Sequence, residues 1–291
     1  MGAVQVYPAE QLAAQHGIPA EVHGTSVGCL TAACRASGAL DVLRSIWSDE
    51  VRGARSFQRL NFPDIWNGLY SMQPLRRMIR EHLHPSMLLT ECYAHMVDLG
   101  SKRYERVLLN ELSADDMEDA LIASCSQVGI HEAAPFQGRL KGDGGISHVL
   151  PHVRAQQGFT AVWAIACSPI TSPGRDHPLE QSEIGLSRSI EMLIDTVERS
   201  DFQHLRALSE AGVEVWLVQP HERPGDPFDA SPETNRWRMN AVGPASWARR
   251  IRVTNRPGLH LSPDMRRQLE AALFDSGIDL GAVLSTIKRD S

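Results

Sequence analysis

The spacing of apolar residues along the chain predicts strands and helices in alternation. Apolar or loosely alternating runs, typical of strands, occur at residues 21–23, 88–99, 104–110, 159–167 and 213–218. Between these runs, apolar residues recur three and four positions apart, which is typical of one face of a helix, and residues typical of helix caps also occur. The predicted helices are 8–15, 29–35, 40–51, 74–84, 115–124, 151–157 and 186–208. This alternation predicts an α/β protein of three layers, in which helices cover both faces of a mostly parallel central sheet.

No break in composition divides the chain, so we expect a single domain over residues 1–291. Its core is expected at about 1–220, followed by a loop-rich and helical extension at about 221–291. Within that extension the Pro/Arg-rich residues 221–257 predict loops, and two further helices are expected at 264–274 and 278–287.

The stretch at residues 20–29, AEVHGTSVGC, predicts a strand, a sharp turn and the start of a helix. Its G-x-S-x-G motif, formed around Gly24, Ser26 and Gly28, is typical of a nucleophile elbow, in which a strained turn exposes a serine hydroxyl. The two glycines let strand and helix approach each other without Cβ clashes. Amides at the helix start, beginning with Val27, can stabilise an oxyanion.

A second motif, Asp143-Gly144-Gly145, follows the short run 137–140 and predicts a carboxylate presented where a strand turns into a loop. Both motifs also have purely structural interpretations. The first can be a glycine-rich helix start in which Thr25 or Ser26 is only the N-cap. The second can be an Asp-Gly type I′ turn in a hairpin.

Together the two motifs resemble those of the patatin-like phospholipases, which pair a G-x-S-x-G serine with the aspartate of a D-G-G or D-G-A motif. The resemblance covers roughly residues 2–167, with the two motifs in the family's order and spacing. Stretches similar to the family are 2–19, 24–28, 67–83, 123–126 and 143–151.

The resemblance implies a serine lipid acyl hydrolase of phospholipase A or esterase type. Ser26 would be the nucleophile and Asp143 the general base and acid, with an acyl-enzyme intermediate and no cofactor. Gly144 and Gly145 would support the aspartate, and the substrate would be a lipid or another acyl ester. A peripheral contact with a membrane is a further expectation.

The chain departs from the family at the oxyanion loop. The family carries a G-G-G-x-[R/K]-G loop after its first strand, and aligned on the elbow only Gly2, its last glycine, has a counterpart here. The first strand and the leading glycines are therefore expected to be missing, and loss of one oxyanion donor can cost about 10²–10³ in rate. This leaves an alternative open: a catalytically impaired patatin-fold protein that acts as a binding or scaffolding module.

Composition and charge narrow the classes of function and the cellular compartments that are open to the protein. A net charge of −6 and an isoelectric point near 6.1 argue against a nucleic-acid binder. Five cysteines without a C-x-x-C pair predict free, buried thiols in a reducing compartment. Neither a leader sequence nor an apolar run of 18 residues occurs, so a cytoplasmic location is expected.

Several other features have both a purely structural and a functional interpretation. The aromatic segment 57–70 is a surface loop or a lipid-facing lid. Arg76, Arg77 and Arg80 form a solvated helix face or bind phosphate. The Arg-Trp stretches at 236–238 and 247–250 form a surface in which Arg stems cover Trp rings, or contact an anionic membrane.

A Ser-His-Asp triad is the rival mechanism, but the elbow comes too early in the chain for the usual α/β-hydrolase order. The candidate bases His148, His152, His177 and His221 have no distinguishing context. No recognised metal or cofactor motif occurs, so neither a metal nor a cofactor is expected.

Overall fold

A computed structural model of the chain describes residues 2–48, 68–153, 158–168, 186–220, 232–241 and 249–251. The chain divides into two compact units, Met1–Arg252 and Val253–Ser291, and all described residues belong to the first. The expected helices at 264–274 and 278–287, and most of the aromatic segment 57–70, lie outside the described residues.

The elements follow one another much as the periodicity predicts. The α-helices are α1 (Val6–His16), α2 (Val27–Ser37), α3 (Leu40–Ser48), α4 (Gln73–His82), α5 (Ala114–Cys125), α6 (Leu186–Glu210) and α7 (Pro232–Ala241). Short 3-10 helices are η1 (Gly2–Gln5), η3 (Pro85–Met87), η4 (Leu109–Glu111) and η5 (Gly144–Ile146). The strands are β1 (Glu21–Thr25), β2 (Glu91–Asp98), β3 (Arg103–Leu108), β4 (Ala134–Phe136), β5 (Arg139–Asp143), β6 (Ala161–Ile165), β7 (Glu214–Val218) and β8 (Arg249–Ile251).

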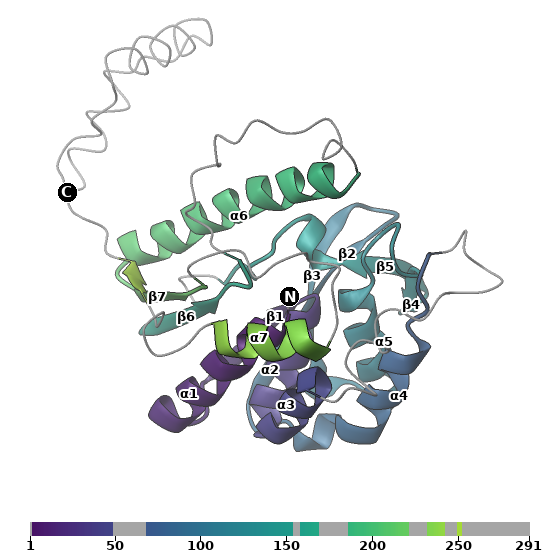
Figure 1. The fold of residues 1–291 in the computed structure, drawn as a ribbon, viewed down its shortest axis with the longest axis horizontal. Helices are drawn as coiled ribbons and strands as arrows, with labels where there is room; N and C mark the ends of the chain where they lie inside the picture. The colour runs from purple at the N-terminus through teal and green to yellow at the C-terminus, as the bar shows by residue number, and fades with distance from the viewer. Residues whose placement is uncertain are drawn as a thin grey trace, which may run out of the picture. The chain divides into compact units, whose positions relative to one another are not determined.

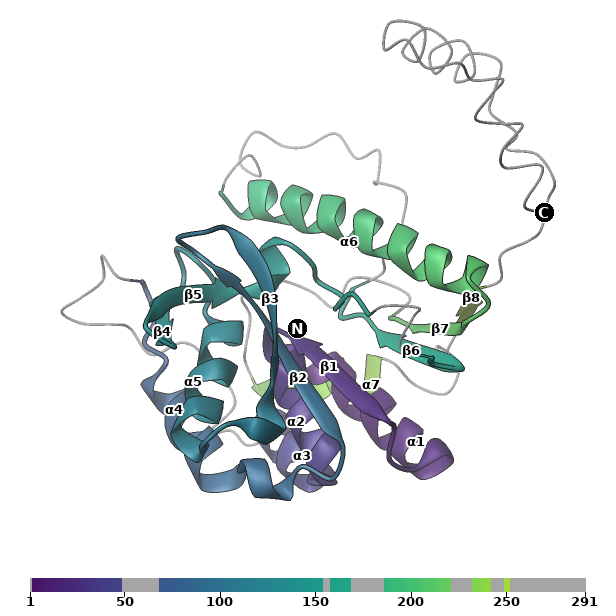
Figure 2. The same cartoon turned by 180° about the vertical axis from the view of Figure 1, so that it is seen from behind.

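The larger sheet has the order β1-β2-β5-β4, with β3 also paired to β2. β1 is parallel to β2, whereas β3 and β5 run antiparallel to it. Short turns join β2 to β3 and β4 to β5, so each of these two pairs is antiparallel. Figure 2 shows the β2–β3 hairpin in front of α2 and α5, which cover one face of this sheet.

The smaller sheet has the order β6-β7-β8, in which β6 and β7 are parallel and β8 is antiparallel to β7. The long helix α6 connects β6 to β7 and runs along them, as a crossover between parallel strands must (Figure 1). The predicted α/β class is confirmed, and the strands form a mixed arrangement.

The two larger apolar cores of the described residues each accompany one sheet. The main core packs α2 and α5 against β2 and includes Leu30, Ala33, Met96 and Leu121, all fully buried. A second core lies between α6 and β7 and includes Leu205 and other residues (Leu208, Val215 and Leu217). The cysteines are unpaired thiols, as predicted, and all but Cys167 are buried.

Several local predictions are wrong. Residues 151–153, expected to open a helix, have no regular structure, and the segment 221–257, expected to be loops, contains α7 and β8. The predicted covering of Trp rings by Arg stems fails on α7, since Trp237 is exposed while Arg238 is buried.

The arginines of α4 do not form a simple solvated face. Arg76 and Arg80 both pair with Glu118 of α5, with Nη1–Oε1 and Nε–Oε2 distances of 3.0 and 2.9 Å. Glu118 is buried, so these pairs compensate a carboxylate that would otherwise lack solvation, and they join α4 to α5. Arg76 is mostly buried and Arg80 is exposed.

Candidate active site

The predicted elbow has the backbone geometry of a strained turn. β1 ends at Thr25 and α2 begins at Val27. Ser26 between them has φ 56° and ψ −137°, a backbone conformation that residues other than glycine rarely adopt. The helix therefore begins two residues before the predicted Cys29. Ser26 is half-buried at this junction between strand and helix, the place that the serine of a nucleophile elbow takes.

Hydrogen bonds on both sides hold the strained residue. The Ser26 carbonyl accepts from the Cys29 amide at 2.9 Å, and the Ser26 amide donates to Ser124 Oγ at 3.1 Å. The Ser124 hydroxyl donates in turn to the carbonyl oxygen of His95 in β2, at 2.6 Å. Because His95 is paired within the sheet, this chain of hydrogen bonds holds the backbone of Ser26 in a fixed position relative to β2.

Of the two glycines in the motif, only the first is required by close packing. A Cβ atom on Gly24 would lie 2.2 Å from the carbonyl oxygen of Gly28 and 2.4 Å from the Cys29 amide nitrogen, which no real contact allows. A Cβ on Gly28 would meet only the Gln5 side chain, at 3.5 Å. The expectation that both glycines permit the close approach therefore holds for Gly24 alone.

Gly2 lies beside the elbow, next to the first residue of α2. A Cβ on this residue would be 2.8 Å from Val27 Cγ2 and 2.4 Å from Trp47 Cζ2. The first-turn amides of α2, those of Val27 and Gly28, have no acceptor within their own helix, so they are free to face an anion at the serine.

Asp143 is the last residue of β5 and is only 5% exposed. Its Oδ1 accepts from the Gly145 amide at 2.7 Å. Burial raises its pKa to about 6, although hydrogen bonds from the Ser26 hydroxyl and the Gly145 amide act in the opposite direction. Gly144 must be glycine, because a Cβ there would lie 2.7 Å from the His95 carbonyl oxygen.

The register of the sheet explains how residues so distant in sequence meet. β3 pairs with Tyr93–Asp98 along one edge of β2, so β1, paired with Glu91–His95, and β5, paired with Met96–Asp98, both lie along the other edge. They run in opposite directions and end next to each other, with Thr25 opposite His95 and Asp143 opposite Met96. Ser26, which follows β1, and Asp143, which ends β5, therefore lie at the same point of the sheet.

A cavity of about 280 Å³ lies beside the elbow. β1 and β6 line it, and each is the edge strand of its sheet. Apolar side chains from α1, α2 and α6, including Leu12, Ala32 and Leu205, complete its wall, together with Thr25 and Gly28 next to the serine.

Imidazole and phenol rings of β1 and β2 lie close to one another. His95 is fully buried, its Nε2 lies 3.0 Å from His23 Nδ1, and His23 Nε2 lies 2.8 Å from Glu21 Oε2. Burial lowers the pKa of His95 to about 2 and also lowers that of His23. A ring with the pKa of His95 binds a proton too weakly to act as a base near neutral pH.

Of the rival base candidates, His148 and His152 contact Asp201 of α6, and His177 and His221 lie outside the described residues. Sequence reasoning missed Ser124 as the partner of the Ser26 amide. Only its position in the small-residue run 123–126 hinted at a close approach.

A family model described as patatin-like phospholipase matches residues 2–155, just over half of the chain. The chain belongs to the patatin-like phospholipase family. Both motifs lie within the match, and the family acts on lipid esters. A comparison with curated proteins gives no match. In the ranges described, each helix is too short or too polar to cross a lipid bilayer.

Proposed function

We propose that this patatin-like protein hydrolyses acyl esters of lipids with a Ser26–Asp143 dyad, through an acyl-enzyme. The observation that carries the proposal is the meeting of a strained elbow serine, at the end of β1, with a buried carboxylate of raised pKa, at the adjoining end of β5. A structural N-cap would explain neither the positive φ of Ser26 nor the burial of the aspartate.

In the first half-reaction, Asp143 accepts the proton of the Ser26 hydroxyl while Oγ forms a bond to the ester carbonyl carbon. The carbonyl π electrons move to the oxygen, and the amides of Val27 and Gly28 stabilise this oxyanion. The intermediate then collapses, the ester C–O bond breaks, and the leaving alkoxide takes the proton from Asp143.

In the second half-reaction, water attacks the acyl-serine carbonyl carbon and gives a proton to Asp143. The bond between the acyl carbon and Oγ breaks, Oγ recovers the proton from Asp143, and the free carboxylic acid leaves. One carboxylate therefore serves both steps, first for the serine and then for water. Its pKa of about 6 suits this role, because it is mostly ionised at pH 7 and still basic enough to accept a proton.

Lipid access is supported by apolar residues exposed near the dyad. Leu140, three residues before Asp143, is 57% exposed, and Val128 is 52% exposed. A Cβ on Gly142 would lie 2.9 Å from Val128 Cγ2, so Val128 is next to the strand that carries Asp143. We therefore include a peripheral membrane contact at this edge in the proposal, for a protein acting in the cytoplasm.

The dyad is tested with chromogenic esters of rising chain length and with phospholipid vesicles. Ser26→Ala and Asp143→Asn are expected to lose at least about 10³-fold in turnover, while Ser37→Ala, on the same helix as the elbow, keeps wild-type turnover. Circular dichroism checks that each variant is folded. Wild-type turnover by either dyad variant refutes the mechanism.

The membrane contact is tested separately with Val128→Ser and Leu140→Ser combined. This double variant is expected to lose activity on anionic vesicles about tenfold while keeping activity on a soluble short-chain ester. Equal loss on both substrates contradicts a role in lipid access.

The second candidate is a catalytically impaired protein of the same fold that acts as a binding or scaffolding module. It predicts that the wild-type chain hydrolyses no ester in the panel, although it is folded and has the same elbow geometry. The ester assay therefore separates the two functions, since only the hydrolase shows turnover that depends on Ser26.

A further inference from the structure

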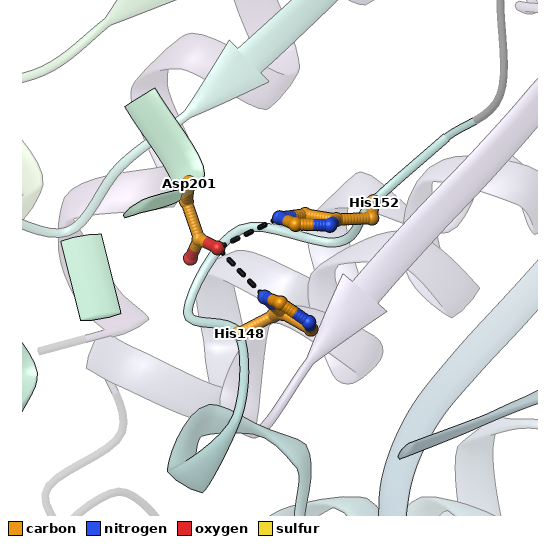
Figure 3. Close-up of side chains that lie close together, drawn as sticks. All are labelled: His148, His152 and Asp201. Atoms are coloured by element: carbon orange, nitrogen blue, oxygen red, sulfur yellow. Dashed lines mark hydrogen bonds and ion pairs between the residues drawn. The ribbon is translucent and has the colours of Figure 1, made fainter. Parts of the chain in front are cut away.

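Three side chains outside the dyad converge on one point. His148 Nδ1 and His152 Nε2 each lie 2.9 Å from the same oxygen of Asp201, its Oδ1 (Figure 3). The ligand atoms of the three residues all lie within 4.8 Å of one another. The histidines follow the D-G-G motif, and the aspartate lies in α6, which brings together two segments distant in sequence.

The carboxylate is held in a fixed orientation. Asp201 is fully buried, and its second oxygen, Oδ2, accepts the Leu150 amide at 2.9 Å. That bond leaves Oδ1 directed at the two imidazoles. A buried carboxylate requires compensation of its charge, and neutral imidazoles provide only hydrogen bonds.

The two rings lie close together beside that oxygen, with the centroids of His148 and His152 3.7 Å apart. A single divalent cation bound to both rings and to Asp201 Oδ1 would neutralise the carboxylate.

The donor set is the one that zinc prefers at sites with an open position. Two imidazole nitrogens and one carboxylate oxygen at about 2.0–2.1 Å from zinc lie about 3.3 Å apart in a tetrahedral arrangement. The two N–O contacts of 2.9 Å therefore need to open by only a few tenths of an ångström, and the two nitrogens lie within 4.8 Å of each other. The side chains of His148 and His152 are 25% and 29% exposed, which gives an ion access and leaves a fourth position for water.

Neighbouring groups hold the rings without competing for the ion. His204 stacks on His152 with centroids 4.0 Å apart, and its Nε2 donates to the Val153 carbonyl oxygen at 2.9 Å. Tyr104 contacts the His148 ring edge-on, with centroids 4.7 Å apart. These contacts fix the ring planes, as outer-shell contacts do at known metal sites.

We propose that His148, His152 and Asp201 bind one divalent transition-metal ion, with zinc preferred. The ion would join α6 to the loop that begins at Asp143, because the His148 amide also donates to the Gly144 carbonyl oxygen at 3.0 Å. This is a structural role for the metal, distinct from the proposed dyad chemistry.

The test uses the full chain stripped with a chelator and then titrated with zinc chloride alone. Calorimetry is expected to show one ion per chain, and the thermal midpoint is expected to rise by about 5 °C or more at zinc concentrations a hundredfold above Kd. Cobalt(II) is expected to give the visible absorption of a tetrahedral site, a readout independent of ester hydrolysis.

His152→Gln and His148→Gln each remove one ligand and are expected to lower zinc affinity by about 100-fold or more. The matched control is His204→Gln, which removes the stacked ring but no ligand and is expected to change affinity less than about tenfold. Absence of saturable binding overturns the proposal, as does unchanged affinity in both ligand variants; the cluster is then only hydrogen-bonded.

Discussion

Replacement of Asp143 by Asn is expected to make the protein more stable at neutral pH, although it removes the proposed base. In the native protein this carboxyl group is buried and has a pKa of about 6, against 3.8 for the unperturbed group. Asparagine has nearly the same shape and keeps an oxygen that can accept from the Gly145 amide, but it carries no charge to desolvate.

The sign and size of the effect follow from proton linkage. Below pH 3.8 the Asp143 carboxyl is protonated in both the folded and the unfolded chain, so its ionisation costs nothing. Between pH 3.8 and about 6 the unfolded chain releases this proton while the folded chain keeps it, so the free energy of unfolding falls as pH rises. At 1.36 kcal/mol per pH unit, the difference reaches about 3 kcal/mol above pH 6 as an upper value.

Urea unfolding of Asp143→Asn and wild type at pH 4, 5, 6, 7 and 8 measures this difference. We expect nearly equal stability at pH 4 and a gain of about 1–3 kcal/mol for the variant at pH 7 and 8. At about 2–4 °C per kcal/mol, the thermal midpoint rises by several degrees. A difference that does not change with pH, or a variant less stable than wild type at pH 8, refutes the assigned burial of a charged base.

Other predictions test the elbow, its glycine and the α4–α5 contact. Ser26→Gly is expected to be about 1 kcal/mol more stable than Ser26→Ala in urea unfolding, because glycine relieves the positive φ, while both variants lack ester turnover. Gly24→Ala is expected to cost at least about 2 kcal/mol through backbone clashes, whereas Gly28→Ala, on an open helix position, is expected to be neutral or to add up to about 1 kcal/mol. Glu118→Gln is expected to lower stability by about 1–2 kcal/mol, because two arginines then lack their carboxylate partner. The wild-type kcat on a soluble ester is expected to rise with pH through about 6, as Asp143 loses its proton; a flat profile from pH 5 to 8 contradicts its role as the base.

The sequence was most informative where function constrains local backbone geometry. The G-x-S-x-G pattern located a turn whose strain is visible in the φ of Ser26, and an aspartate followed by two glycines located the end of β5. Both signals are local: glycine at positions 24 and 144 is required by contacts under 3 Å to neighbouring backbone. Local requirements of this kind can be recognised from spacing alone.

The parts that could not be predicted depend on contacts between distant segments. Asp201 is one of several acids on a long helical pattern, and only the packing of α6 brings it to His148 and His152. Arg238 lies in a Pro/Arg-rich segment that indicates loops, yet it is buried on α7. Whether a charged residue is buried depends on its neighbours in the folded structure, so the spacing of apolar residues along the sequence does not predict it.

The two members of the proposed dyad are both anchored to β2, at neighbouring residues. The carbonyl oxygen of His95 accepts from Ser124, whose hydroxyl oxygen accepts the Ser26 amide. Asp143 pairs with Met96, the next residue of β2, and the Gly144 that follows it packs so closely on the His95 carbonyl that no side chain fits there. A strained serine and a buried acid are each unfavourable to folding, and they persist because the paired, buried strand β2 holds both.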